Sequence, residues 1–285
     1  MKHILLPTDF SENSWNAIIY AIQLFRNEEC TFHLYNAYTP IIYHVEYVLV
    51  NPAQFGLGDS VRDASLESLN KLTKRIKKEF KENPNHQFVT VARFDSLVSG
   101  IKELVSERHI DLIVMGTQGA TGAKEVLFGT NTVHVFKDIK CPVLAIPSGF
   151  DFESPHEILL PTDLKLTYQN THLDLLVDIA VAHHSRVNAL HVSNGYTLSE
   201  PQQDHKQELE AMFKGTAYLY HEYASMDIEV GVNEFQVKHK INLLVMINNK
   251  HSFFENLFFS NTINQIGFHL NVPFMVIPSK IQRAS

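Results

Sequence analysis

The amino-acid sequence predicts an α/β protein built from two tandem, open, five-stranded parallel sheets with flanking helices. The chain has 285 residues, about twice the commonest domain length. Its two halves open with nearly the same segment, His3–Asp9 and Glu157–Asp163, and close with similar segments, Cys141–Pro147 and Val272–Pro278. In the first half, short apolar runs alternate with stretches of helical periodicity, which is typical of parallel strands joined by crossover helices. Two copies of one fold account for this pattern best.

The first copy contains five predicted strands and four predicted helices. The strands are the apolar runs 3–7, 31–37, 87–93, 111–115 and 142–146. The first helix follows Ser11, whose hydroxyl suits a helix cap. Apolar faces at helical spacing define the first three helices: Trp15, Ile18, Ile19, Ile22 and Phe25, then Leu69, Leu72, Ile76 and Phe80, then Val98, Ile101 and Val105. We expect the lysine-rich stretch 71–81 to be the solvated face of the second helix.

The second copy repeats this pattern with losses. Its second helix is predicted from one apolar face: Leu209, Met212, Phe213, Thr216, Leu219 and Tyr223. Its third helix is predicted to be cut short, with only Asn233–Lys240 remaining. The polar stretch Ser148–Pro155 suits a linker, which predicts domains at 1–148 and 156–285.

The last strand of each copy, 142–146 and 273–277, would be an exposed apolar edge by itself. We therefore expect these two strands to pair with each other and to close an internal pseudo-dimer.

Composition argues against several classes of protein. The net charge of −7 lacks the basic footprint that phosphate-backbone binding requires, so nucleic acid is not an expected partner. Residues 1–150 carry 15 lysines and arginines against 16 acidic residues, whereas 151–285 carry 9 against 15. Cys30 and Cys141 are too few for a disulfide framework. No apolar run is long enough to cross a membrane and the start of the chain turns polar too soon for a signal peptide, so we expect a cytoplasmic location.

The most informative motif is a glycine-rich loop after the fourth predicted strand. Gly116, Gly119 and Gly129 allow backbone N–H groups to turn toward an anion without a Cβ in the way. Gly129 and Thr130 then open the next helix, whose unpaired N–H groups and dipole favour a phosphate. In an open parallel sheet, ligands bind at the carboxyl ends of the strands, so this loop and the one after the first strand are the expected site. The chemistry is that of a nucleotide-binding loop.

The spacing G-x2-G-x9-G-[S/T], filled by Gly116, Gly119, Gly129 and Thr130, resembles that of the nucleotide-binding branch of the universal stress protein family. Three further segments resemble the same family: 6–11, 111–116 and 141–144. The resemblance covers nearly all of the first copy and, more weakly, the second. It implies a tandem family member with a Rossmann-like fold, ATP as ligand, and antiparallel pairing of the two closing strands. We also expect Mg²⁺ to bridge the phosphates, since this ion usually keeps its waters and needs few protein ligands.

The resemblance also implies roles for individual residues. Pro7, Thr8 and Asp9 would line the adenine and ribose end, Asn36 would flank the base, and Gly116 would approach the ribose. Gly119, Gly129, Thr130 and Asn131 would hold the phosphates, with Lys124 as a candidate for charge neutralisation. For Asp9 the alternative is helix capping, and for Lys124 it is an ordinary solvated lysine.

The second copy departs from the pattern at the glycines. A gapless alignment places Ile247 at Gly116, Lys250 at Gly119 and Ser260 at Gly129, and four phenylalanines crowd the segment 253–259. These side chains would stand where bare backbone should meet phosphate. We therefore expect the second copy to bind no nucleotide, with Asp163 as a relic or turn-former.

The sequence thus predicts an ATP-binding regulatory or stress-response protein, with the second copy as a degenerate scaffold. Two alternatives remain open: a slow ATP hydrolase or phosphotransferase, for which no general base is visible, and a nucleotide-free interaction module that docks through 253–259. A further homodimer is also open. The chain has 16 histidines, including His183, His184 and His191, but no H-x3-H or HExxH pattern, so no specific metal site is expected.

Overall fold

The computed structural model describes residues 1–38, 57–117, 129–169, 171–193, 195–225, 227–248 and 271–279. The strands in these ranges are β1 Lys2–Pro7, β2 Cys30–Tyr38, β3 His86–Phe94, β4 Leu112–Gly116, β5 Val143–Ile146, β6 Glu157–Pro161, β7 Arg186–Ser193, β8 Ala217–Ala224, β9 Leu243–Asn248 and β10 Phe274–Pro278. The helices are α1 Glu12–Leu24, α2 Leu57–Glu79, α3 Leu97–Glu107, α4 Thr130–Asp138, α5 Leu173–Ala182, α6 Glu200–Met212 and α7 Ile228–Lys238.

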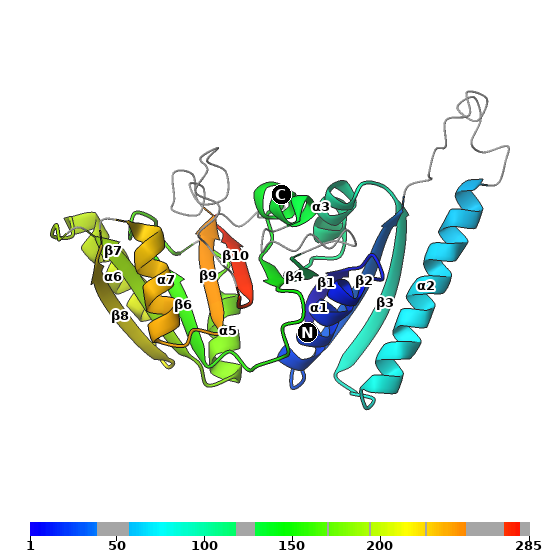
Figure 1. Ribbon diagram of the computed structural model, residues 1–285, viewed down its shortest axis with the longest axis horizontal. Coiled ribbons are helices and arrows are strands. Elements are labelled where there is room, and N and C mark those ends of the chain that lie inside the picture. The colour runs from blue at the N-terminus through cyan, green and yellow to red at the C-terminus, as the bar shows by residue number, and fades with distance from the viewer. Residues whose placement is uncertain are drawn as a thin grey trace, which may run out of the picture.

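The ten strands form one sheet in the order β3-β2-β1-β4-β5-β10-β9-β6-β7-β8 (Figure 1). Each half is parallel, and the halves join where β5 and β10 pair antiparallel, with Phe274 opposite Ala145 and Val276 opposite Val143. The predicted α/β fold and the internal pairing of the two closing strands are confirmed. The strands of the first copy begin and end within one residue of the predicted runs.

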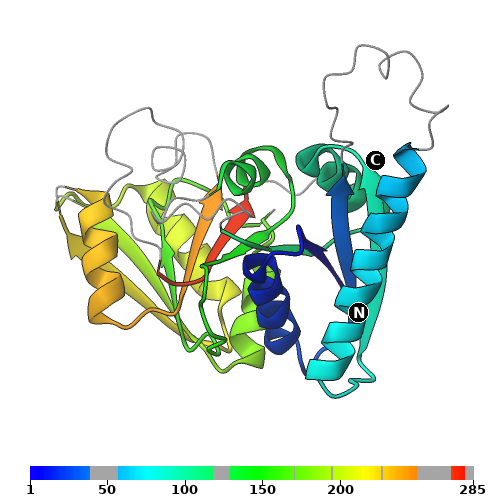
Figure 2. The same cartoon turned by 45° about the vertical axis from the view of Figure 1, so that its right-hand side comes forward.

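Helices cover both faces of this sheet. One face carries the side chains of α1, α2, α5 and α6, which pack in a single apolar cluster with alternate strand residues such as Ile4 and Leu6. The other face carries α3, α4 and α7, packed on the intervening residues such as Leu5. Figure 2 shows the two layers from a second direction. Because successive side chains of a strand point to opposite faces of the sheet, the strands contribute to two apolar cores, one on each face.

Two helix predictions for the second copy are wrong. Helix α6 ends at Met212, and Leu219 and Tyr223 lie on strand β8 instead. Gly215 has a φ of +104°, which a helix cannot contain, so the apolar spacing ran across a turn. Helix α7 is not cut short: it begins at Ile228, because the Asp227 carboxylate accepts hydrogen bonds from the N–H groups of Glu229 and Val230.

Ser11 caps α1 as predicted, since its Oγ accepts a hydrogen bond from Ser14 N at 3.2 Å. The expected solvated face of α2 is also confirmed, because the lysines at 71, 74, 77 and 78 on the helix, and Lys81 just after it, are all exposed.

The segment between the two halves is held by specific contacts. Asn16 Nδ2 on α1 donates to the carbonyl oxygens of Pro147 and Phe150 at 3.3 and 3.1 Å. The His183 ring lies between Ser154 Oγ and Leu24 O, each at 2.8 Å, and so bridges the halves. These contacts add to the β5–β10 pairing that joins the two halves of the sheet. The proposed domain limits, 1–148 and 156–285, stay a prediction.

In the described part of the chain, no helix combines the length and the apolar character that crossing a membrane requires.

Acidification is expected to lower the free energy of unfolding through His33 on β2. Burial, and then the neighbouring His3 and Arg108, lower the pKa of His33 from 6.5 to about 4. The unfolded chain then binds more protons than the folded chain, so stability present above pH 6.5 is lost as the pH falls toward 4, by up to about 1.4 kcal/mol per pH unit. Urea unfolding at pH 7, 6 and 5 measures this slope. His33→Gln should reduce the slope, and an unchanged slope would contradict the assignment to His33.

Candidate functional site

A cavity of ≈ 440 Å³ opens at the carboxyl ends of the strands in the first half. It is lined by Pro7, Thr8, Asp9, Ser14, Asn36, Ala37, Asp95, Ser96, Leu97, Met115, Gly116, Gly129, Thr130, Asn131 and Thr132. Because the strand order is β3-β2-β1-β4, these residues form one continuous edge from the end of β3 to the start of α4. A ligand at this edge would be in the place that open parallel sheets generally use.

The turn between β1 and α1 forms the middle of the cavity. Thr8 is buried, and its Oγ1 accepts a hydrogen bond from Phe10 N at 3.0 Å and contacts Ser14 Oγ at 3.0 Å. These bonds hold Phe10 at a φ of +64°, a conformation that L-residues rarely adopt. The turn is therefore fixed by its own side chains.

The Asp9 carboxylate accepts hydrogen bonds from Ser11 N at 3.1 Å and Ser11 Oγ at 2.5 Å. Burial raises the pKa of Asp9, but these hydrogen bonds outweigh it and the net pKa is lowered. Asp9 is thus charged at neutral pH and orients the serine that caps α1. Asp9 therefore does not cap α1 itself but holds Ser11, which does. The same carboxylate also lines the cavity.

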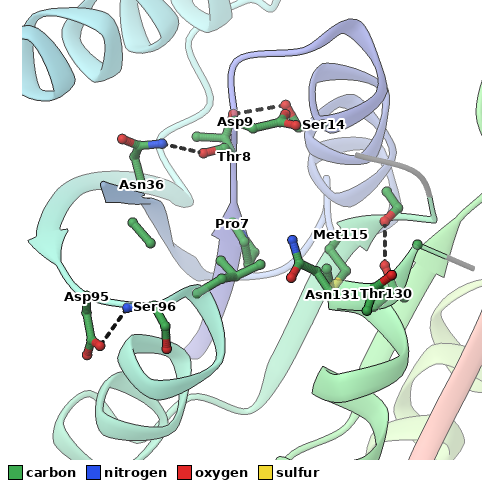
Figure 3. A pocket seen from close by; sticks show the side chains of 15 residues that line it. Pro7, Thr8, Asp9, Ser14, Asn36, Asp95, Ser96, Met115, Thr130 and Asn131 are labelled. Atoms are coloured by element: carbon green, nitrogen blue, oxygen red, sulfur yellow. Dashed lines mark hydrogen bonds between the residues drawn. The ribbon is translucent and has the colours of Figure 1, made fainter. Parts of the chain in front are cut away.

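Asn36, near the end of β2, forms two side-chain hydrogen bonds within the protein. Its Nδ2 donates to Thr8 O at 2.7 Å (Figure 3). Its Oδ1 accepts from Ser65 Oγ on α2 at 2.7 Å. The amide therefore joins α2 and β2 to the β1–α1 turn. Asn36 lines the cavity, and its side-chain hydrogen bonds position the walls; that it flanks a base stays a prediction.

The N-terminus of α4 forms one end of the cavity. Gly129 precedes the helix and has no side chain that could cap it. Thr132, in the first turn of α4, donates its hydroxyl to Gly116 O at the end of β4 at 3.2 Å. The N–H groups in the first turn of a helix have no partner inside the helix, and the helix dipole makes this end partially positive. Thr130 and Asn131 lie here, so this end of the cavity suits an anion.

Gly116 serves packing as well as the cavity. A Cβ at this position would lie 2.5 Å from Asn13 Nδ2 and 3.1 Å from Asn13 O. The absence of a side chain therefore allows the end of β4 to approach the first turn of α1. The resemblance gave a different reason for this glycine, a close approach to ribose, which stays a prediction.

The opposite end of the cavity is acidic. Asp95 follows β3, and its carboxylate accepts a hydrogen bond from Ser96 N at 2.6 Å. Figure 3 shows Asp95 and Ser96 on one side of the cavity and Thr130 and Asn131 on the other, with Pro7 between them. Among the described lining residues, Asp9 and Asp95 are the charged groups, and none is a lysine or arginine. The cavity thus runs from hydrogen-bond acceptors to the positive end of a helix.

The structure gathers most of the residues that the sequence indicates. Eight of them line the cavity: Pro7, Thr8, Asp9, Asn36, Gly116, Gly129, Thr130 and Asn131. Gly119 and Lys124 lie outside the described residues.

Sequence reasoning missed Asp95, Ser96 and Leu97. They follow β3, which lies next to β2 at the edge of the sheet, whereas the sequence pointed only to the loops after the first and fourth strands. The feature of the sequence that could have identified them is the polar pair Asp95-Ser96, which lies between a strand and a helix. Ser96 caps α3 through Ser99 N.

The second half has a different arrangement at the corresponding edge. His191 takes the place of Asn36, and its Nδ1 contacts Thr162 O at 2.9 Å. Gln202 on α6 donates to Asp163 O at 2.9 Å, and His205 contacts Leu164 O at 2.8 Å, so α6 lies against the β6–α5 turn. Ile247 stands on β9 where the first half has Gly116. The remaining replacements, Lys250, Ser260 and the phenylalanines of 253–259, lie outside the described residues.

The histidines that raised the question of a metal have other contacts. His183 and His191 bond to backbone carbonyls, and His184 occupies a turn with a φ of +53°. Within the described ranges, no group of three or more His, Cys, Asp or Glu side chains could hold a metal ion.

Comparison with known proteins places these features in context. The model of the universal stress protein family matches residues 1–147. The universal stress protein MJ0577 of Methanocaldococcus jannaschii is 32% identical over 155 residues, covering 51% of this chain and 94% of that protein.

Two solved structures align along nearly the whole chain and show likeness of the fold alone. The crystal structure of a universal stress protein from Archaeoglobus fulgidus has a TM-score of 0.65 at 16% identity, covering 96% of this chain and 95% of that chain. The functionally unknown protein PA1789 from Pseudomonas aeruginosa has a TM-score of 0.60 at 14% identity, covering 98% and 92%.

Proposed function

Because this chain belongs to the universal stress protein family, we propose that it is a cytoplasmic regulatory protein whose first domain, residues 1–148, binds one ATP. The second domain, residues 156–285, serves as a scaffold that completes the internal pseudo-dimer. The observation that carries the proposal is the polarity of the cavity, with the Asp95 carboxylate at one end, Asp9 in the middle and the N-terminus of α4 at the other end.

A nucleotide matches this polarity. Its phosphates would lie against the first turn of α4, at Gly129, Thr130 and Asn131, where N–H groups and the helix dipole favour anions. Its ribose hydroxyls and exocyclic amine are donors, which the carboxylates of Asp9 and Asp95 can accept. The cavity volume of ≈ 440 Å³ lies in the range of small-molecule sites.

The described residues also suggest how the charge of the phosphates would be balanced. Among the described lining residues, the N-terminus of α4 is the positive group, and a hydrated Mg²⁺ or Lys124 would supply the rest of the balancing charge. A Mg²⁺ ion usually keeps several of its waters and needs few protein ligands. Asp9 follows the interior strand β1, whereas Asp95 follows the edge strand β3, so Asp9 is the carboxylate that would lie closer to such an ion.

Calorimetry with the full chain tests this function. ATP is expected to bind with one site per chain, and adenosine at least about tenfold more weakly, because adenosine leaves the N-terminus of α4 unused. Inorganic triphosphate should also bind more weakly than ATP, because it leaves the Asp95 end of the cavity unused. Equal affinities for ATP and adenosine would contradict the placement of the phosphates. Absence of ATP binding would refute the function itself, and two sites per chain would refute the scaffold role of the second domain.

A further inference from the structure

A second and larger cavity, ≈ 1060 Å³, lies at the other end of the first half. It is formed where α1 and α2 end and β3 begins, at the amino ends of the strands and away from α4. Figure 2 shows the end of α2 and the start of β3 meeting at the lower edge of this half. None of its lining residues belongs to the candidate nucleotide site. We call it the basic groove.

The floor of the basic groove is apolar. Ile22 of α1 and Ile76 of α2 are 4% and 2% exposed, and the partly buried rings of Phe80 and Phe88 lie beside them. Phe88 stacks on Phe32 with ring centroids 5.3 Å apart, which fixes its orientation. A hydrocarbon chain placed here would exchange water for apolar side chains.

The rim of the basic groove is cationic. Arg26 follows α1, whereas Lys77 lies in the last turn of α2 and Lys81 just after it; all three are exposed, and none forms an ion pair with another described residue. Glu82 is the acidic residue among the described lining. A structural role explains part of this charge, because Lys77 lies in the last turn of α2, where a cation interacts favourably with the helix dipole. That role does not explain Arg26, which lies beyond the end of α1. In a chain of net charge −7, these cations create a local attraction for anions.

The end wall of the basic groove is ordered before any ligand arrives. Asn83 Nδ2 donates to Arg26 O at 2.7 Å, and Asn83 Oδ1 accepts from Asn85 N at 3.1 Å. The ring of His86 contacts Phe25 O through Nε2 at 3.0 Å. These bonds tie the turn after α2 to the end of α1, so binding would cost little ordering of the chain.

From this combination we propose that the basic groove binds an amphipathic anion, with a hydrocarbon chain on the floor and a carboxylate or phosphate head among Arg26, Lys77 and Lys81. The small size of the apolar floor favours a small molecule over a protein partner. A stable protein interface buries about 800 Å² on each side, whereas this floor consists of four side chains. The groove is separate from the candidate nucleotide site, so the proposal stands or falls independently of ATP binding.

Calorimetry on the full chain at low ionic strength tests the proposal with decanoate and decyl phosphate, each below its micelle concentration. Both heads are compared, so the preferred anion is identified. 1-Decanol, which lacks the charge, and inorganic phosphate, which lacks the chain, should each bind at least about tenfold more weakly than the better of the two amphiphiles. Failure of both amphiphiles to bind, or binding of 1-decanol as tightly as either, would overturn the proposal.

A matched pair of variants places the ligand in the basic groove. K77Q/K81Q removes two rim cations and should weaken binding at least about tenfold, with a shallower dependence on salt. K74Q/K78Q removes two exposed lysines of the same helix that do not line the groove, and should leave the affinity within about twofold. Circular dichroism melting confirms that both variants fold. Equal effects of the two pairs would overturn the proposal.

Discussion

Replacing Thr130 by glutamate is expected to lower the affinity for ATP at least about 100-fold while leaving the fold intact. Thr130 is the first residue of α4 and lines the candidate nucleotide site. An added carboxylate would stand where the phosphates are proposed to bind, and two unit charges about 4 Å apart repel by about 4 kcal/mol at an effective dielectric constant of 20. The same charge favours the helix itself, because it lies at the positive end of the dipole. Calorimetry with ATP, together with thermal unfolding of the variant, separates the two effects.

Two further variants control for this result. Thr130→Val removes the hydroxyl without adding charge and should weaken ATP binding much less than glutamate does. Gln203→Glu adds the same charge in the first turns of α6, away from the cavity, and should leave binding unchanged. If Thr130→Glu retains the affinity of the wild type, the phosphates do not lie at α4.

Replacing Gly100 by alanine is expected to lower the free energy of unfolding by about 2 kcal/mol. A Cβ at this position in α3 would lie 1.9 Å from the hydroxyl oxygen of Tyr35 and 2.9 Å from its Cζ. Tyr35 is completely buried, so the ring has little room to move. Overpacking costs up to about 3 kcal/mol, and alanine recovers about 1 kcal/mol of helix propensity relative to glycine, so the clash outweighs the gain. Urea unfolding of the two proteins gives the difference.

Tyr35→Phe should relieve this clash. The Tyr35 hydroxyl is buried and has no hydrogen-bond partner within the described structure, so its removal alone should be close to neutral. In the double variant Gly100→Ala/Tyr35→Phe, the closest atom is gone and stability should recover by about 1 kcal/mol or more. Strictly additive effects of the two substitutions would show that the hydroxyl is not the obstacle.

Much of the fold could be predicted because its signals are local. Strands buried on both faces, such as β4, appear as short apolar runs, and all five strands of the first copy lie within a residue of the predicted runs. The prediction failed where one apolar pattern is compatible with both a helix and a strand. The apolar residues from Leu209 to Tyr223 satisfy a helical spacing, yet Gly215 ends that helical pattern and the later residues form β8. The start of α7 was missed because its signal is a single cap, Asp227.

The candidate site could be predicted in part for the same reason. The residues on the first strand and at the start of α4 stand out in sequence, because glycines and a strand-to-helix turn have recognisable composition. Asp95 and Ser96 do not stand out, since their importance depends on β3 lying beside β2.

The sequence by itself determined the two copies, the strands of the first copy, and two of the segments that face the cavity, the turn after the first strand and the start of α4, because these depend on the periodicity and backbone freedom of neighbouring residues. The tertiary structure alone decided which side chains meet. It joined Asn36 to Thr8 and Ser65, set Gly116 against Asn13, and brought Arg26 to Lys77 and Lys81 around the basic groove. Contacts of this kind depend on strand order and on the face that each helix buries, so residues distant in the chain become neighbours only once the sheet has formed.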